Sequence, residues 1–139
     1  MAIYVTSDAH GHVRALDEAL SKISLASDDT LYVLGDMIDR GPDPLGVIKL
    51  VRSLPNAHVL KGNHEQIMLD AIIGQDPLDA ETWDINGGWT TRQQLNDMEF
   101  EAYEELVRWM ATLPLYAVAE TDERPVEREH VAVAAQQAR

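Results

Sequence analysis

The first seventy residues alternate between short apolar runs and longer segments with apolar residues at helical spacing. The short runs are residues 2–6, 30–34 and 58–60. The helical segments that follow them are residues 13–23, 44–54 and 64–73. The second of these begins after Asp43 and ends before Pro55, both of which are typical helix boundaries. This alternation predicts an α/β fold, in which helices pack on a layered parallel sheet.

The second half of the chain is less regular. We interpret residues 76–88 as a polar loop that contains Trp83. Residues 100–113 have the periodicity of an amphipathic helix, and residues 115–119 are compatible with a strand. From residue 120 the chain is highly charged, and its weak apolar run at 131–135 does not assign a structure to it.

The amino-acid composition excludes several classes of function. The chain has 139 residues, enough for one small domain, and its formal net charge is -13. Such an acidic surface argues against binding to nucleic acid or to anionic membranes. There is no cysteine, which excludes thiol chemistry, and no apolar run approaches the ~20 residues of a membrane span. We therefore expect a cytoplasmic protein.

Polar residues cluster immediately after each of the three predicted strands. These residues are Asp8 and His10 after the first strand, Asp36, Asp39 and Arg40 after the second, and Asn63 and His64 after the third. Ligands of open α/β sheets bind at the carboxyl ends of the strands. The topology therefore predicts that these side chains gather at one edge of the sheet.

The residue types in this cluster point to metal-assisted phosphate chemistry. Carboxylate, imidazole and amide oxygen together suit a divalent cation, and their number suggests two ions. Arg40 offers a planar, permanently charged group that matches phosphate oxygens. His64 could donate a proton to a leaving oxygen, with Asp39 stabilising its charged form.

The same residues also have structural interpretations. Asp8 and His10 could serve as turn and capping residues. Asp36, Asp39 and Arg40 could form an ion-pair cluster, and Asn63 with His64 could simply start the third helix, but three such clusters in order favour function. Further residues are interpreted as structural: His12 as a helix start, His58 as surface or packing, and Trp83, Trp89 and Trp109 as packing residues. Residues 86–88 are first of all a turn, with lining of a substrate groove as a second possibility.

The three clusters together resemble a known family. Asp8-x-His10, Gly35-Asp36-x-x-Asp39-Arg40-Gly41 and Gly62-Asn63-His64-Glu65 are similar to the N-terminal motifs of the calcineurin-like metallophosphoesterases. The Asp39-Arg40-Gly41 ending and Glu65 resemble its phosphoprotein-phosphatase branch, especially the small bacterial and phage members. The resemblance covers residues 2–119, including 86–88 and 113–115, and implies the N-terminal half of an α/β/β/α sandwich.

The resemblance also implies a role for each site residue. Asp8 and His10 would bind the first metal, Asp36 would bridge two metals, and Asn63 would bind the second metal and the substrate. Arg40 would bind the phosphate, and Asp39 with His64 would protonate the leaving group. The implied cofactors are two divalent ions, Mn²⁺ first, with Fe, Zn or Mg as alternatives.

The implied function is a phosphoester hydrolase in which metal-bound hydroxide attacks phosphorus directly. The first expectation is a Ser/Thr or Tyr protein phosphatase acting on phosphorylated protein or a small phosphoester. Symmetrical diadenosine-tetraphosphate hydrolases share the motifs and are an alternative. A metal- and phosphate-binding remnant without turnover is another.

The chain departs from the family in its C-terminal part. Family members complete the second metal site with two later histidines, and no matching motif occurs here; His130 stands in a different context. We therefore expect residues 1–139 to be a single, C-terminally truncated domain, with a divergent tail at 120–139. A sheet without its later strands would leave an edge uncovered, which favours a homodimer.

Overall fold

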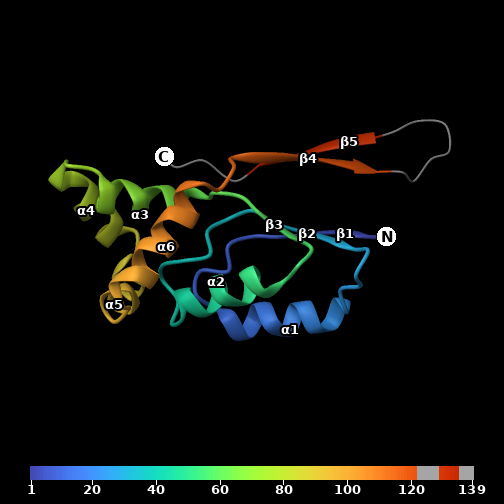
Figure 1. Ribbon diagram of the computed structural model, residues 1–139, viewed down its shortest axis with the longest axis horizontal. Coiled ribbons are helices and arrows are strands. Elements are labelled where there is room, and N and C mark those ends of the chain that lie inside the picture. The colour runs from blue at the N-terminus through green and yellow to red at the C-terminus, as the bar shows by residue number, and fades with distance from the viewer. Residues whose placement is uncertain (122–128, 135–139) are drawn as a thin grey trace.

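The computed structural model describes residues 1–121 and 129–134, with side chains described up to residue 119 (Figure 1). The strands are β1 (Ile3–Thr6), β2 (Thr30–Val33), β3 (Ala57–Val59), β4 (Tyr116–Thr121) and β5 (Glu129–Ala134). The helices are α1 (Val13–Ile23), α2 (Pro44–Ser53), α3 (Asn63–Ile73), α4 (Pro77–Ile85), α5 (Trp89–Asn96) and α6 (Phe100–Ala111). The elements expected in the first seventy residues are all present, within one or two residues of the predicted bounds.

A parallel three-stranded sheet in the order β1-β2-β3 forms the centre of the molecule. Helices α1 and α2 lie on one face of this sheet, and the antiparallel β4–β5 hairpin lies on the other (Figure 1). Strand β2 alternates between these faces: Leu31 and Val33 join the core beneath the helices, whereas Tyr32 packs with Leu60 and Ala119 of the hairpin side. The layered α/β prediction is confirmed.

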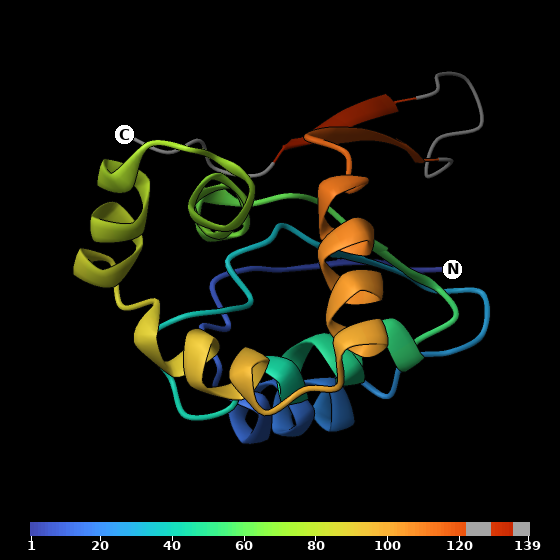
Figure 2. The ribbon, with the colours of Figure 1, turned by 60° about the vertical axis from the view of Figure 1, so that its left-hand side comes forward.

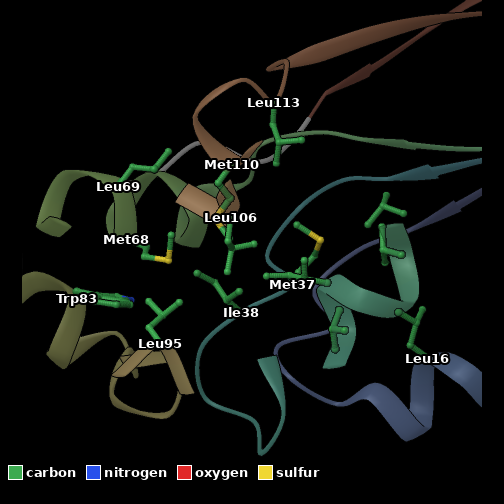
Figure 3. Close-up of a cluster of buried hydrophobic side chains, with 14 of the residues drawn as sticks. Leu16, Met37, Ile38, Met68, Leu69, Trp83, Leu95, Leu106, Met110 and Leu113 are labelled. Carbon is green, nitrogen blue, oxygen red and sulfur yellow. The ribbon is translucent and has the colours of Figure 1, made fainter. Parts of the chain in front are cut away.

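The loop after β2 is anchored in the main core by two adjacent apolar residues. Met37 and Ile38 are fully buried, although they belong to no helix or strand (Figure 3). They lie among core side chains of α3, α4, α5 and α6 such as Met68, Trp83 and Leu106. Their burial fixes the backbone that carries the polar residues on either side of them.

The interpretation of residues 76–88 as a loop is wrong, because most of this segment is helix α4. Asp76 caps the helix by accepting a hydrogen bond from the Leu78 amide (3.0 Å), and Pro77 occupies the first helical position. The helix buries only Trp83, so its sequence carries no apolar repeat. Helix α5, equally poor in apolar periodicity, was not predicted either.

The remaining expectations for the second half have mixed outcomes. Trp83 is buried and Trp109 is half-buried against the core, as expected, but Trp89 is 57% exposed, so its assignment as a packing residue is wrong. The expected strand at 115–119 is β4, and part of the charged segment forms β5, which pairs with it. Residues 122–128 and 135–139 and the His130 side chain lie outside the described part of the structure.

Among the described residues, no helix combines the length and apolar character that crossing a membrane requires.

Candidate active site

The loops after β1, β2 and β3 meet at the carboxyl edge of the sheet, as the topology predicts. The His10 amide donates to the Asp36 carbonyl (3.0 Å), which joins the first loop to the second. Gly35 and Gly62 join the second to the third: a Cβ on Gly35, whose φ is +93°, would lie 2.2 Å from the Gly62 nitrogen. This contact explains why glycine is needed there.

Asp8, His10 and Asp36 offer ligand atoms that all lie within 4.8 Å of one another. The Nδ1 atom of His10 lies 2.8 Å from the Ile38 carbonyl oxygen. A carbonyl only accepts, so Nδ1 carries the hydrogen and Nε2 is left as a ligand atom. Burial raises the pKa of Asp36, and the neighbouring Asp8 raises it further. Two carboxylates and an imidazole this close form a donor set that suits a divalent cation.

Asn63, in the first turn of α3, strengthens the case for a metal. Its Oδ1 atom is buried and has no hydrogen-bond partner among the described residues. Buried polar atoms are rarely left unpaired, and a divalent cation is a partner that an amide oxygen can take. The residues present therefore fit the metal that the donor set implies.

Asp39 and His64 form a buried pair. Asp39 Oδ2 lies 2.7 Å from His64 Nδ1, and the two side chains are 0% and 7% exposed. An ionised carboxylate only accepts, so His64 donates from Nδ1 and its Nε2 atom is free for other chemistry. The rings of His64 and His10 meet edge to face with centroids 4.6 Å apart, which places the pair next to the candidate metal ligands.

Arg40 is exposed at the rim of the site. Its amide donates to the Gly87 carbonyl (2.9 Å), and its Nε to the Asn86 carbonyl (3.4 Å). Residues 86–88 form a turn, as predicted, and this turn borders the guanidinium. Among the other predicted residues, His12 is exposed at the start of α1, and His58 is exposed and stacks on Tyr32.

Glu65 has a structural role that the sequence did not suggest. Its buried carboxylate accepts hydrogen bonds from the amides of Asp36, Met37 and Gly62, at 2.7, 2.9 and 2.8 Å. Burial raises the pKa of Glu65 to about 7. Glu65 thereby ties the loop after β2 to the start of α3.

The backbone around the site is held in an unusual conformation. Five of its non-glycine residues have a positive φ: Asp8, His10, Asp36, Asp39 and Arg40. L-residues occupy this left-handed region at a cost of about 1–2 kcal/mol each, so the surrounding structure must enforce it.

The fold and the site together define a class of protein. Loops at the carboxyl edge of a parallel sheet present a carboxylate, imidazole and amide donor set beside an arginine, as expected for metal-assisted phosphate chemistry. The family model of the calcineurin-like phosphoesterases matches residues 1–131. The chain belongs to that family.

Individual relatives cover the same region. The symmetrical bis(5'-nucleosyl)-tetraphosphatase of Proteus mirabilis is 31% identical over 98% of this chain and 46% of its own length. Serine/threonine-protein phosphatase 1 of Salmonella typhimurium is 39% identical over 65% of this chain and 41% of its own. A metallophosphoesterase structure from Sphaerobacter thermophilus is 28% identical with a TM-score of 0.58, over 84% of this chain and 42% of that one. The chain thus spans less than half the length of these relatives.

Proposed function

We propose that this chain carries the N-terminal catalytic motifs of a metal-dependent phosphoester hydrolase. The observation that supports this most is the convergence of three distant loops, which brings the ligand atoms of Asp8, His10 and Asp36 within 4.8 Å of one another. The Asn63 oxygen, which has no hydrogen-bond partner among the described residues, and the Asp39–His64 pair lie at the same edge. Metal ligands, a proton donor and a guanidinium are the parts that hydrolysis at phosphorus requires.

In this proposal Asp8 and His10 would hold one divalent ion, Asp36 would be shared with a second, and Asn63 would hold the second. Mn²⁺ is the proposed metal. A bound divalent ion supplies Lewis-acid activation of water and of the phosphoryl oxygens. Asp36 and Asp8 are held close together despite their like charge, which a cation between them would relieve.

Arg40 and His64 act on the substrate in this scheme. The exposed Arg40 guanidinium binds the phosphoryl oxygens and orients them, which a planar bidentate donor does well. His64 donates a proton from Nε2 to the leaving oxygen, because Nδ1 is committed to Asp39. The buried Asp39 carboxylate stabilises the imidazolium before the transfer.

For the substrate we propose a dinucleoside polyphosphate, cleaved at a phosphoanhydride bond of its polyphosphate chain. The sequence alone placed a phosphoprotein first, but relatives named as symmetrical tetraphosphatases align with almost all of this chain. A phosphoserine, phosphothreonine or phosphotyrosine peptide is the second candidate, supported by the similarity to the Salmonella phosphatase. Incubation with diadenosine tetraphosphate and with a phosphopeptide, followed by product analysis, distinguishes them.

Hydrolysis of p-nitrophenyl phosphate with added Mn²⁺ tests the general proposal. We expect Asp36→Asn to lower the rate at least about 100-fold. We expect a smaller loss in His64→Ala, because p-nitrophenolate leaves with little need of a proton. His58→Ala is the control and should leave the rate unchanged, because His58 is an exposed histidine that stacks on Tyr32 and has no role in the proposed site. Equal rates in all variants would contradict the proposal.

A remnant that binds metal and phosphate without turnover is the competing function. It is favoured if the second metal site is incomplete. Metal analysis of the protein decides between them: about one ion per chain without hydrolysis supports the remnant, and two ions with hydrolysis support the enzyme.

We also propose that the chain self-associates. Strand β4 and the residue before it expose three large apolar side chains: Leu115 is 50%, Tyr116 67% and Val118 54% exposed. Sedimentation of the native chain and of Tyr116→Lys tests this: a dimer that the substitution converts to monomer is expected, and a monomeric native chain contradicts it.

A further inference from the structure

The Asp39 carboxylate receives hydrogen bonds from helices α4 and α5 as well as from His64. The Trp83 indole Nε1 donates to it from α4, 3.0 Å from Oδ1 and 3.2 Å from Oδ2. The Thr91 hydroxyl donates to Oδ1 from α5 at 2.7 Å. Asp39, Trp83 and Thr91 are each at most 3% exposed, so the hydrogen bonds among them form without competition from water.

Helix α5 and the turn before it also hold the backbone of the loop that follows β2. Asp39 and Arg40 have φ angles of 71° and 69°, in the left-handed region. The Asp39 amide donates to the Thr91 hydroxyl (2.9 Å), and the Arg40 amide donates to the Gly87 carbonyl (2.9 Å). The Thr91 hydroxyl therefore accepts from the Asp39 backbone and donates to the Asp39 side chain.

The indole of Trp83 is itself closely held. A Cβ on Gly88 would lie 2.3 Å from the indole Nε1, so only glycine allows the turn to pass this close to the ring. The guanidinium of Arg92, a residue of α5, lies 4.9 Å from the centroid of the Trp83 ring. Figure 2 shows α4 and α5 as a continuous arm beside the loop that follows β2. The arm thus presents fixed donors to Asp39.

We propose that Trp83 and Thr91 are positioning residues for leaving-group protonation by His64, an inference that rests on the proposed hydrolysis. His64 donates from Nδ1 to Asp39 Oδ2 (2.7 Å), so the orientation of its ring follows the orientation of the Asp39 carboxylate. Trp83 and Thr91 fix that carboxylate mainly through its other oxygen, Oδ1. Without these two hydrogen bonds the Asp39 carboxylate would rotate. The His64 ring would then rotate with it, and Nε2 would no longer be held in a fixed orientation toward the leaving oxygen.

The first test observes His64 directly in the metal-free protein. A histidine Nδ1 proton bonded to a buried carboxylate exchanges slowly and gives a separate downfield proton resonance. We expect this resonance in the native chain, and its loss or broadening in Trp83→Phe and in Thr91→Val. Each substitution removes a donor; Thr91→Val does so at nearly constant volume, whereas Trp83→Phe also makes the buried ring smaller. Thr91→Ser keeps the hydroxyl and should keep the resonance.

Thr90→Val is the matched control. Thr90 is the neighbouring residue on α5, and its hydroxyl is buried with no partner among the described residues. Its replacement should leave the His64 resonance unchanged. If Thr91→Val does not fold, Trp83→Phe carries the test. An unchanged resonance in every folded variant overturns the proposal.

The second test separates positioning from a merely structural role through the leaving group. Phenyl phosphate needs protonation of its leaving oxygen far more than p-nitrophenyl phosphate does. We expect Trp83→Phe and Thr91→Val to lower kcat on phenyl phosphate at least about 10-fold, with a smaller loss on p-nitrophenyl phosphate. Thr91→Ser, which keeps the hydroxyl, should keep the native rate on both substrates. Equal losses on the two substrates overturn the proposal.

The two tests keep this proposal distinct from the proposed function. If the native chain hydrolyses neither ester, the proposed function fails, and the His64 resonance still decides whether Trp83 and Thr91 hold the pair.

Discussion

At the residue scale, the site is built from residues whose backbone lies in the left-handed region, where glycine is less strained than any residue with a side chain. Asp8, His10, Asp36, Asp39 and Arg40 all have positive φ, and all were assigned a chemical role from the sequence. Each retains a side chain where glycine would fit better. This coincidence of strain and chemical role is typical of functional sites and supports the assignment.

Arg40 offers a direct measurement of this strain. At its φ of 69° a Cβ is unfavourable, so Arg40→Gly is expected to be more stable than Arg40→Ala by about 1 kcal/mol. Urea unfolding of both variants measures the difference. The same pair of substitutions at Arg108, within helix α6, should give the opposite order, because alanine is the better helix former. An identical order at both positions would count against strain at Arg40.

Glu65 is expected to matter for stability rather than for substrate. Glu65→Gln replaces one acceptor oxygen with an amide that faces backbone donors, so we expect a loss of about 3 kcal/mol in the free energy of unfolding. Glu105→Gln, at an exposed pair with Arg52, should lose far less. Comparable losses in denaturant titrations would contradict the role assigned to Glu65.

At the element scale, single polar side chains join segments that are not neighbours in the chain. Asp29 accepts from the Ala2 amide with Oδ1 and from the Ala26 amide with Oδ2, both at 2.8 Å. Asn56 donates to the carbonyls of Ala26 and Asp29. These contacts tie the start of β1, the loop before β2 and the start of β3 together.

Asp29 predicts a pH dependence of stability. The hydrogen bonds from the backbone amides of Ala26 and Ala2 lower the pKa of Asp29 below 3.8. A carboxyl with a lowered pKa in the folded state stabilises the protein fully above its unfolded pKa, and this contribution is lost as pH falls through the folded value. The native chain should therefore exceed Asp29→Asn in stability at pH 6, and the difference should shrink below pH ~4. Thermal unfolding across this range measures it; a constant difference would be inconsistent with the role of the carboxylate.

At the scale of the whole molecule, three loops from three strand ends produce one site. The loop after β2 is anchored in the core by the buried side chains of Met37 and Ile38. Glu65 connects this loop to α3, and Thr91 of the arm formed by α4 and α5 connects to it through Asp39. Because the loops are joined by backbone hydrogen bonds, ligand binding should stabilise the entire fold and not the site alone.

The effect of added metal on the unfolding of the protein measures this coupling between site and fold. With Mn²⁺ at 100 times its dissociation constant, the free energy of unfolding should rise by about 2.7 kcal/mol, seen as a higher Tm. Asp36→Asn, which alters the proposed bridging ligand, should abolish most of the rise, whereas His58→Ala should keep it. A rise of equal size in Asp36→Asn would show that the metal binds elsewhere.

The central elements and the site motifs could be predicted because their signals are local. Residues 2–6 and 30–34 are apolar runs followed at once by Asp8 and Asp36, and a parallel arrangement brings such strand ends together. Helices α4 and α5 could not be predicted in this way. Each buries at most three side chains, so neither shows the apolar repeat by which a helix is identified.

What the sequence by itself determined is the α/β alternation, the order of the motifs and the types of ligand atom they bring. Only the tertiary structure decided which buried polar groups meet: Trp83 and Thr91 reach Asp39 from 44 and 52 positions away, and Glu65 receives amides from another loop. The physical reason is that secondary structure follows from neighbouring residues. A buried donor or acceptor, in contrast, must be satisfied by whatever the completed packing places beside it.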